Sequence, residues 1–247
     1  GFIPYVNTIA TFLTRRCFEQ NVLDLGLHNT NVRLISNGGG TVYAPLGPTH
    51  LAIDDIAIMR TIPNMTIVSP ADADEMRRFM MQTLDHEGPI YIRLGKGYDP
   101  IVTTDDIPFA IGKGIPMKEG KDILIVTTGI CLGIALEAAE ILLEKKIDAS
   151  VLHLHTIKPL DKEMLINMAE KVPAIISLEE HNIIGGLGSA CAEILIEENF
   201  NEKKSFKRIG IPDVFPSGYG NQKDMMARNG ISAPHVVSET LELLINH

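Results

Sequence analysis

The regular alternation of short β-rich runs with helical runs is the feature that most constrains the fold of this chain. After residue 121, the β-rich runs "DILIVTTG", "ASVLHLHTI", "AIISLEE" and "FKRIGIP" alternate with helical patterns near 132–145, 161–170, 187–198 and 234–246. Such alternation favours a mainly parallel sheet with helices on both faces, because each crossover must return the chain along the sheet. The sequence therefore predicts the α/β class.

The first part of the chain alternates in the same way. Its β-rich runs are "YVNTIA", "VRLISN", "MTIVSP" and "IYIRL", with helical patterns around 12–27, 50–60 and 71–85. Ser69 and Asp72 have the spacing of a capping box, with Pro70 at the first helical position, which predicts a helix start there. Because the sequence opens almost directly on a strand pattern, we expect an earlier part of this fold to lie in another segment or subunit.

A change in composition divides the chain. Residues 96–121 are rich in glycine, proline and charge and lack a helical period, which is typical of a linker. The expected organisation is a first domain at 1–95, this linker, and a second domain at 122–247. A chain of 247 residues with 45% hydrophobic side chains can form two ordinary cores.

Charge and cysteine usage exclude several classes of protein. The 31 acidic residues outnumber 22 basic ones, and no basic stripe indicates nucleic-acid binding. The longest apolar passage, "ILIVTTGICLGIALEAAEILL", is broken by "TTG" and charged by two glutamates, so it predicts strand, turn and helix rather than a membrane span. No CxxC pair suggests a zinc or redox site, and scattered cysteines fit a reducing cytoplasm. The three cysteines are Cys17, Cys131 and Cys191.

The stretch "GPTHLAIDDIAIMR" places His50 after a tight turn, at the start of the predicted helix 50–60. The helix dipole would disfavour the imidazolium there, whereas Asp54 one turn on would favour it, and the sequence leaves the sign open. The turn would direct His50 beyond the carboxyl ends of the strands, where ligands of open α/β folds bind. The alternative is a histidine that caps a helix or bonds a loop.

Two further stretches carry candidate binding residues. In "TFLTRRC", Phe12 could stack on a planar ring while Arg15 or Arg16 reaches a phosphate or carboxylate. In "IYIRLGKG", Arg93 near the end of an apolar strand suits the binding of an anion. The alternatives are a core phenylalanine and arginines in solvent.

Two other patterns carry weaker signals. "EEHNIIGGLGSA" has Gly185, Gly186 and Gly188 in the order G-G-x-G, not the G-x-G-x-x-G of a dinucleotide site, which favours close packing of helix on strand. His153 and His155 alternate on one face of a strand, but no third ligand for a metal is evident.

The order of these motifs is more specific than any one of them. "TFLTRRCFEQ", "GPTH", "RTIPNM", "SPAD", "IRL", "KPLD" and "EEHNIIGGLGSACAE" follow each other as in the carboxyl-terminal half of the transketolase family, which this chain closely resembles over essentially its whole length. The family includes transketolase, 1-deoxyxylulose-5-phosphate synthase and, more distantly, the β subunits of 2-oxo acid dehydrogenases. The resemblance implies a pyrimidine-binding domain followed by a transketolase C-terminal domain.

The resemblance also implies a cofactor and site residues. The cofactor is thiamine diphosphate with Mg²⁺, whose carbanion attacks a ketose and holds a two-carbon unit before transfer to an aldehyde. Phe12 matches the aromatic residue that packs on the aminopyrimidine ring, and Arg15 matches an arginine beside it, with Arg16 a rival. His50 matches the histidine that exchanges protons with substrate hydroxyls. Arg93 matches an arginine that binds the phosphate of a sugar phosphate.

Several positions depart from the family pattern. Leu46 stands where both relatives have an aspartate, Gly38 where transketolase has a histidine, and Gly39 where the synthase has an arginine. A less polar donor pocket is therefore expected, and with it a substrate other than the usual ketose phosphate. The GDG motif with its downstream asparagine, which holds the diphosphate and Mg²⁺, does not occur, and the family's catalytic glutamate is expected upstream of Gly1.

These observations predict the carboxyl-terminal part or subunit of a split, transketolase-like enzyme, inactive alone and completed by an amino-terminal partner in a dimer or heterotetramer. No nucleic acid or membrane is expected as a partner. The alternatives are a subunit like 1-deoxyxylulose-5-phosphate synthase or the 2-oxo acid dehydrogenase β chain, and a catalytically silent assembly or regulatory module. The presence of Phe12, His50 and Arg93 together argues against the silent module.

Overall fold

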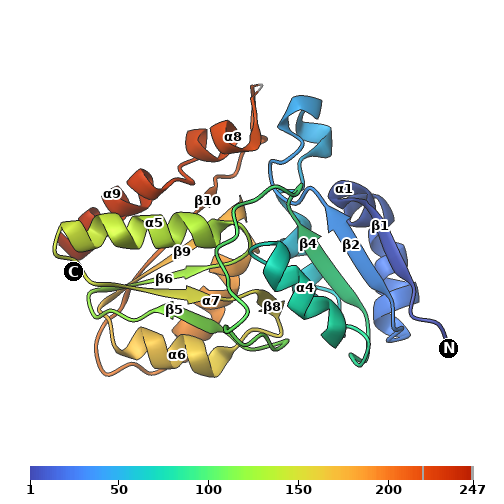
Figure 1. The fold of residues 1–247 in the computed structure, drawn as a ribbon, viewed down its shortest axis with the longest axis horizontal. Helices are drawn as coiled ribbons and strands as arrows, with labels where there is room; N and C mark the ends of the chain where they lie inside the picture. Colours follow the sequence, from blue (N-terminus) through green and yellow to red (C-terminus); the bar gives the residue numbers. More distant parts are fainter. Residues whose placement is uncertain (219, 246–247) are drawn as a thin grey trace.

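The computed structural model describes residues 1–218 and 220–245 and contains two five-stranded sheets with flanking helices, arranged side by side (Figure 1). This confirms the predicted α/β class. The fold places four parallel strands of the first sheet with their carboxyl ends at a common edge, where ligands of such folds bind.

The first sheet has the order β1-β2-β4-β3-β8. Its first four strands are parallel, and β8 pairs antiparallel with β3. The strands are β1 (Tyr5–Ile9), β2 (Arg33–Asn37), β4 (Ile90–Leu94), β3 (Thr66–Val68) and β8 (Thr156–Lys158).

The helices of the first domain are short and partly irregular. Between β1 and β2 the chain forms α1 (Ala10–Leu13), a 3-10 turn, α2 (Phe18–Gln20) and a π-helical turn at Asn21–Leu27. The later helices are α3 (Asp55–Arg60) and α4 (Ala73–Gln82).

The second sheet has the order β10-β9-β6-β7-β5, with only β5 antiparallel. Its strands are β5 (Ile115–Lys118), β6 (Ile123–Thr127), β7 (Ala149–His153), β9 (Ala174–Asn182) and β10 (Ser205–Ile211). Its helices are α5 (Cys131–Glu144), α6 (Lys162–Glu170), α7 (Leu187–Glu197), α8 (Gln222–Arg228) and α9 (Ala233–Ile245).

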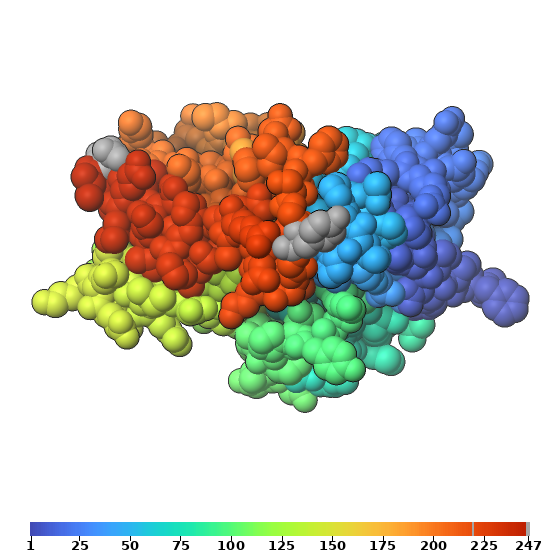
Figure 2. Space-filling view, turned by 90° about the horizontal axis from the view of Figure 1, so that it is seen from above, coloured from blue at the N-terminus to red at the C-terminus, as the bar shows by residue number. Residues whose placement is uncertain are grey.

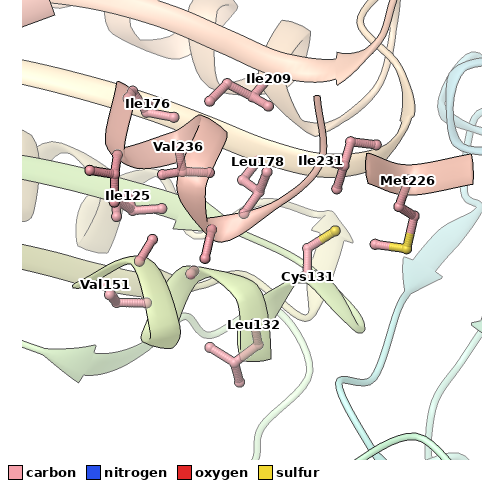
Figure 3. Packing of buried hydrophobic residues seen from close by; sticks show 14 of the residues in the cluster. Ile125, Cys131, Leu132, Val151, Ile176, Leu178, Ile209, Met226, Ile231 and Val236 are labelled. Atoms are coloured by element: carbon pink, nitrogen blue, oxygen red, sulfur yellow. The ribbon is translucent and has the colours of Figure 1, made fainter. Parts of the chain in front are cut away.

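The core of the second domain lies on both faces of this sheet. Because side chains alternate along a strand, Ile123 and Ile125 of β6 face α5, α8 and α9, whereas Leu124 and Val126 face α6 and α7. Cys131 at the start of α5 packs into the first of these layers (Figure 3). The apolar run 123–143 is thus a strand, a turn and a buried helix, as predicted.

Three local expectations need correction, and one helix was not expected. Residues 115–118, expected within a linker, form β5 and pair with β7. The run "ASVLHLHTI" divides into two strands in different sheets, because β8 leaves β7 and joins β3. Helix α4 begins at Ala73, and its N-cap is Asp72, whose carboxylate accepts a hydrogen bond from the backbone N–H of Glu75. Helix α8 was not expected at all.

The helices and the cysteines bear on what the sequence predicted about membrane spans and cysteine pairing. Within residues 1–218 and 220–245, no helix combines the length and apolar character that crossing a bilayer would require. The three cysteines are unpaired, with Cys131 and Cys191 buried.

Candidate functional site

The rings of Phe12 and His50 meet at the carboxyl edge of the first sheet. Phe12 lies on α1, which begins directly after β1, and His50 ends a 3-10 turn at Pro48–His50. Their ring centroids are 5.6 Å apart and their planes cross at 63°, an edge-to-face arrangement favoured by the quadrupole of the aromatic ring. Both residues are half-buried. The structure therefore brings together two of the predicted site residues.

Arg16 covers part of the same aromatic surface. Its guanidinium carbon lies 3.8 Å from the centroid of the Phe12 ring, within the range of a cation–π contact. On the sequence alone, Arg15 and Arg16 were rivals for the place beside Phe12. In this structure Arg16 contacts the ring.

Arg15 is directed toward the segment that carries His50, which we call the His50 loop (residues 47–55). Its Nη2 donates to the carbonyl of Leu51 at 2.8 Å, and its Nε lies 3.6 Å from Oδ1 of Asp54. Burial raises the pKa of Asp54, and the charge of Arg15 opposes that rise.

The surroundings of His50 differ from those predicted. Helix α3 begins only at Asp55, so His50 does not lie in its first turn and the dipole argument for the imidazole does not apply. The preceding Gly47 has φ of +81°, a conformation that glycine adopts without strain, and Thr49 Oγ1 lies 3.0 Å from His50 Nδ1.

Arg93 does not lie in the exposed environment that a residue binding an anion at the end of a strand would need. Its side chain is only 6% exposed, and its Nε donates to Asp55 Oδ2 at 2.7 Å. Its Nη2 donates to the carbonyls of Ala52 at 3.2 Å and Glu180 at 2.9 Å. Burial alone would raise the pKa of Asp55, but the charge of Arg93 holds it below its ordinary value. This geometry does not support the predicted role of Arg93 in phosphate binding.

Glu180 completes a buried polar cluster between the two domains, and no role was predicted for it from the sequence. Its Oε1 accepts hydrogen bonds from the backbone N–H of Thr41 at 2.8 Å and from the Thr41 hydroxyl at 2.6 Å. Its Oε2 accepts a bond from Gln222 at 2.9 Å. Burial raises the pKa of Glu180. The signal in the sequence that could have indicated this buried carboxylate is the pair of adjacent glutamates at the end of an apolar strand.

The hydrogen bonds of this cluster join the two domains beside the His50 loop. Figure 2 shows the light-blue surface near residue 50 next to the red and orange surface of the C-terminal domain. The second domain is therefore in a position to affect the geometry of the candidate site.

The glycine-rich turn before α7 binds a carboxylate of its own chain. Glu179 accepts hydrogen bonds from the backbone N–H groups of Leu187 at 2.7 Å and Gly188 at 2.8 Å. A Cβ atom on Gly186 would collide with the same carboxylate. The turn therefore serves close packing, and Glu179 fills the place that a ligand phosphate would need at the helix N-terminus.

The two histidines of "LHLH" are both buried, and His153 contacts Glu75 of α4. His153 Nε2 lies 3.0 Å from Glu75 Oε2, and the His155 ring stacks on Phe109 with centroids 3.9 Å apart. Burial lowers the pKa of His155 to about 3. Among the residues that the structure describes, no group of three or more histidine, cysteine, aspartate or glutamate side chains is arranged to hold a metal.

A hollow of about 230 Å³ opens beside the carboxyl ends of β2 and β4. Its lining includes Asn37, Asp72 and Lys96, and the Lys96 side chain is exposed. A cation therefore lies three residues beyond Arg93, on the loop where the strand ends. This lysine stands within "IRLGKG", but no role was predicted for it from the sequence.

Two consecutive sheet-and-helix domains, with an aromatic and imidazole pair at the carboxyl edge of the first, agree with the pyrimidine-binding domain and transketolase C-terminal domain that the order of the motifs implied. Residues 1–98 match the profile of the transketolase pyrimidine binding domain, and residues 112–236 match that of the transketolase C-terminal domain. The chain belongs to the transketolase family.

Individual relatives support this assignment. The 6-deoxy-6-sulfo-D-fructose transketolase subunit of Clostridium sp. (strain MSTE9) is 36% identical over 97% of this chain and 75% of its own length. One subunit of the apulose-4-phosphate transketolase of Phocaeicola vulgatus is 35% identical over 95% and 74%, respectively. A solved structure described as a split gene transketolase, inactive beta4 tetramer, is 38% identical with a TM-score of 0.90, covering 99% of this chain and 77% of its own.

Proposed function

We propose that this chain is the carboxyl-terminal subunit or segment of a split transketolase that transfers a two-carbon ketol unit between sugars. The observation that carries the proposal is the edge-to-face pair of Phe12 and His50 at the carboxyl edge of the first sheet. An aromatic ring and an imidazole at this edge suit a planar cofactor ring and a proton-transfer step within one crevice.

The residues present fit the ring end of thiamine diphosphate. Phe12 is half-buried and Arg16 lies over one face of its ring, so we assign the opposite face to the aminopyrimidine. When bound, the cofactor supplies the carbanion that breaks and forms the carbon–carbon bond. The diphosphate and Mg²⁺ ligands are assigned to the partner, since the described residues offer no metal-binding group.

His50 is assigned the proton transfers at the substrate. Its Nδ1 lies beside the Thr49 hydroxyl, which leaves Nε2 to exchange protons with a sugar hydroxyl as that hydroxyl becomes a carbonyl. Phe12 fixes one side of the imidazole and limits its rotation. The tight turn at Gly47 fixes the backbone directly before the turn that carries His50.

The substrate class proposed is a sugar with an anionic group. The two relatives described above carry in their names a sulfo sugar and a sugar phosphate, which share a negative charge. The exposed Lys96 at the end of β4 is the cation that we assign to this charge, because Arg93 is buried in an ion pair. We expect Gly38, Gly39 and Leu46 to leave the donor pocket less polar than in the ketose-phosphate enzymes.

The proposed partner is an amino-terminal transketolase segment or subunit, with which the chain forms a dimer or heterotetramer in the cytoplasm. Two relatives are named as subunits, and the beta4 tetramer of the similar solved structure is described as inactive. Those descriptions support a division of the active site between polypeptides.

Co-purification with a candidate amino-terminal partner tests this function. The complex should bind thiamine diphosphate in the presence of Mg²⁺ in calorimetric titrations and transfer a two-carbon unit to an aldehyde, whereas the chain alone should do neither. A stable complex that binds no cofactor would identify the chain as a silent assembly module instead.

A further inference from the structure

The His50 loop is fixed to both domains by its backbone. The N–H of Ala52 donates to the carbonyl of Gly40 at 3.0 Å, and the Gly40 N–H donates back to the Ala52 carbonyl at 2.8 Å. The carbonyl of Ile53 accepts from the backbone N–H of Asn182 in the second domain at 2.8 Å. A loop held at successive residues can keep a side chain within the narrow tolerance that proton transfer requires.

Arg93 is the side chain on which these attachments converge. Its guanidinium bonds the Asp55 carboxylate at the end of the His50 loop, the Ala52 carbonyl two residues after His50, and the Glu180 carbonyl of β9. A planar guanidinium with several fixed donors can join three acceptors in this way, whereas a lysine ammonium cannot match its geometry.

The neighbouring residues leave space for the Arg93 side chain and fix the position of its ion-pair partner. A Cβ atom on Gly39 would lie 2.7 Å from Arg93 Cγ, so the missing side chain at residue 39 makes room for the arginine. The Tyr91 hydroxyl donates to Asp55 Oδ2 at 2.7 Å and lies 2.7 Å from Ser36 Oγ. Asp55 is thereby held by Tyr91 of β4, whose hydroxyl is itself fixed by Ser36 of β2. Asp55 can hold Arg93 in turn.

We infer that Arg93 is a positioning residue, which fixes the His50 loop and couples it to the C-terminal domain, and is not a ligand of the substrate anion. The catalytic consequence rests on the proposed function of His50. The anchoring of the loop does not rest on that proposed function, because it follows from contacts within this chain.

The substitution Arg93→Lys tests the inference, because it keeps the charge opposite Asp55 but removes the fork of donors. In the complex with the amino-terminal partner, hydrogen–deuterium exchange of the amides at residues 47–55 should become faster. With D-fructose 6-phosphate and D-fructose as donor probes, kcat should fall by about 10- to 100-fold for both, with the ratio of their KM values unchanged.

Arg60→Lys is the matched control. Arg60 also joins the domains, through the carbonyl of Gly185 at 2.7 Å and the carboxylate of Glu193 at 2.6 Å, but it does not touch the His50 loop. Its variant should leave exchange at residues 47–55 unchanged. If both variants speed that exchange equally, the effect is a general loosening of the domains and the inference fails.

The remaining outcomes distinguish the anchoring of the His50 loop by Arg93 from anion binding by Arg93 and from the effect of the anchoring on catalysis. A selective rise in the KM for fructose 6-phosphate, with unchanged exchange in the loop, would overturn the inference and make Arg93 an anion ligand. Faster exchange with unchanged kcat would uphold the anchoring of the loop and overturn its proposed consequence for catalysis. If Arg93→Lys does not fold, Tyr91→Phe removes one bond to Asp55 and should produce the same changes, smaller in size.

Discussion

The imidazole of His50 meets the ring of Phe12 edge to face, with ring centroids 5.6 Å apart, although 38 residues separate the two in the chain. The contact joins the helix that follows β1 to the turn that precedes α3. Phe12 also contacts Arg16 and His50 also contacts Thr49, so each ring keeps a partner when the other is removed, and the two substitutions should have different and separable effects.

Replacement of His50 by alanine should slow turnover in the reconstituted complex by about 10²- to 10⁴-fold, the range expected when a general acid or base is lost. Binding of thiamine diphosphate, measured by calorimetry, should change little, because Arg16 still contacts the Phe12 ring when the imidazole is removed. Unchanged turnover would exclude a chemical role for His50.

Replacement of Phe12 by alanine should weaken cofactor binding by about ten-fold or more, since stacking on an aromatic ring would be lost. The measurement is the dissociation constant of thiamine diphosphate in the complex. Phe200→Ala is a matched control, because Phe200 contacts Lys204 in the second domain, and it should leave the constant unchanged. Equal losses in the two variants would argue against a site at Phe12.

Acidification should destabilise the chain through His155. The pKa of this histidine is about 3 in the folded state, because burial disfavours its charged form, against an ordinary value near 6.5. The unfolded chain therefore binds a proton that the folded chain does not, and stability falls as the pH drops from about 6.5 toward 3. From pH 7 to pH 5 the free energy of unfolding should fall by about 2 kcal/mol from this group.

Urea unfolding of the His155→Gln variant checks this expectation. The variant should lose less stability between pH 7 and pH 5 than the natural chain. Glu75, whose pKa is lowered by His153 despite its burial, adds a further loss only below about pH 4.5. A variant with the full acid sensitivity of the natural chain would refute the assignment to His155.

Replacement of Gly186 by alanine should destabilise the second domain by about 1–3 kcal/mol, because the added methyl group collides with the Glu179 carboxylate that caps α7. Gly133→Ala is the matched control, since its Cβ would meet only Val102 at 3.6 Å in a helix that favours alanine. Urea unfolding of both variants is the measurement, and equal stabilities would contradict the packing role of the turn.

Most strands were predictable because their apolar and β-branched runs are long and end at glycine, proline or serine. Strand β5 was missed because "IPMK" contains a proline and a lysine and is half-exposed at a sheet edge, so it lacks the pattern of a central strand. Strand β8 was hidden within one continuous run, and only tertiary contacts show that the chain changes sheets between His153 and Thr156.

The site was predictable only in part. Phe12 and His50 stand within short motifs that locate them at strand ends. The role of Arg93 depends on Asp55 and Glu180, which lie 38 and 87 residues away, and no local pattern reports such distances. The sequence does not show whether an arginine is buried or exposed. The structure shows that Arg93 is buried and bonded within the chain, whereas an arginine that binds a ligand must be accessible to it.

Strand β8 follows β7 of the second sheet in the chain, yet it forms the outer edge of the first sheet. Cutting the chain after the first domain would therefore leave β3 with a bare row of backbone donors and acceptors, which invites aggregation. The two halves cannot be exchanged as independent cassettes, and a truncation at the apparent boundary should fail to give a well-behaved protein. The three residues of β8 thus link the two domains into one unit that must fold together.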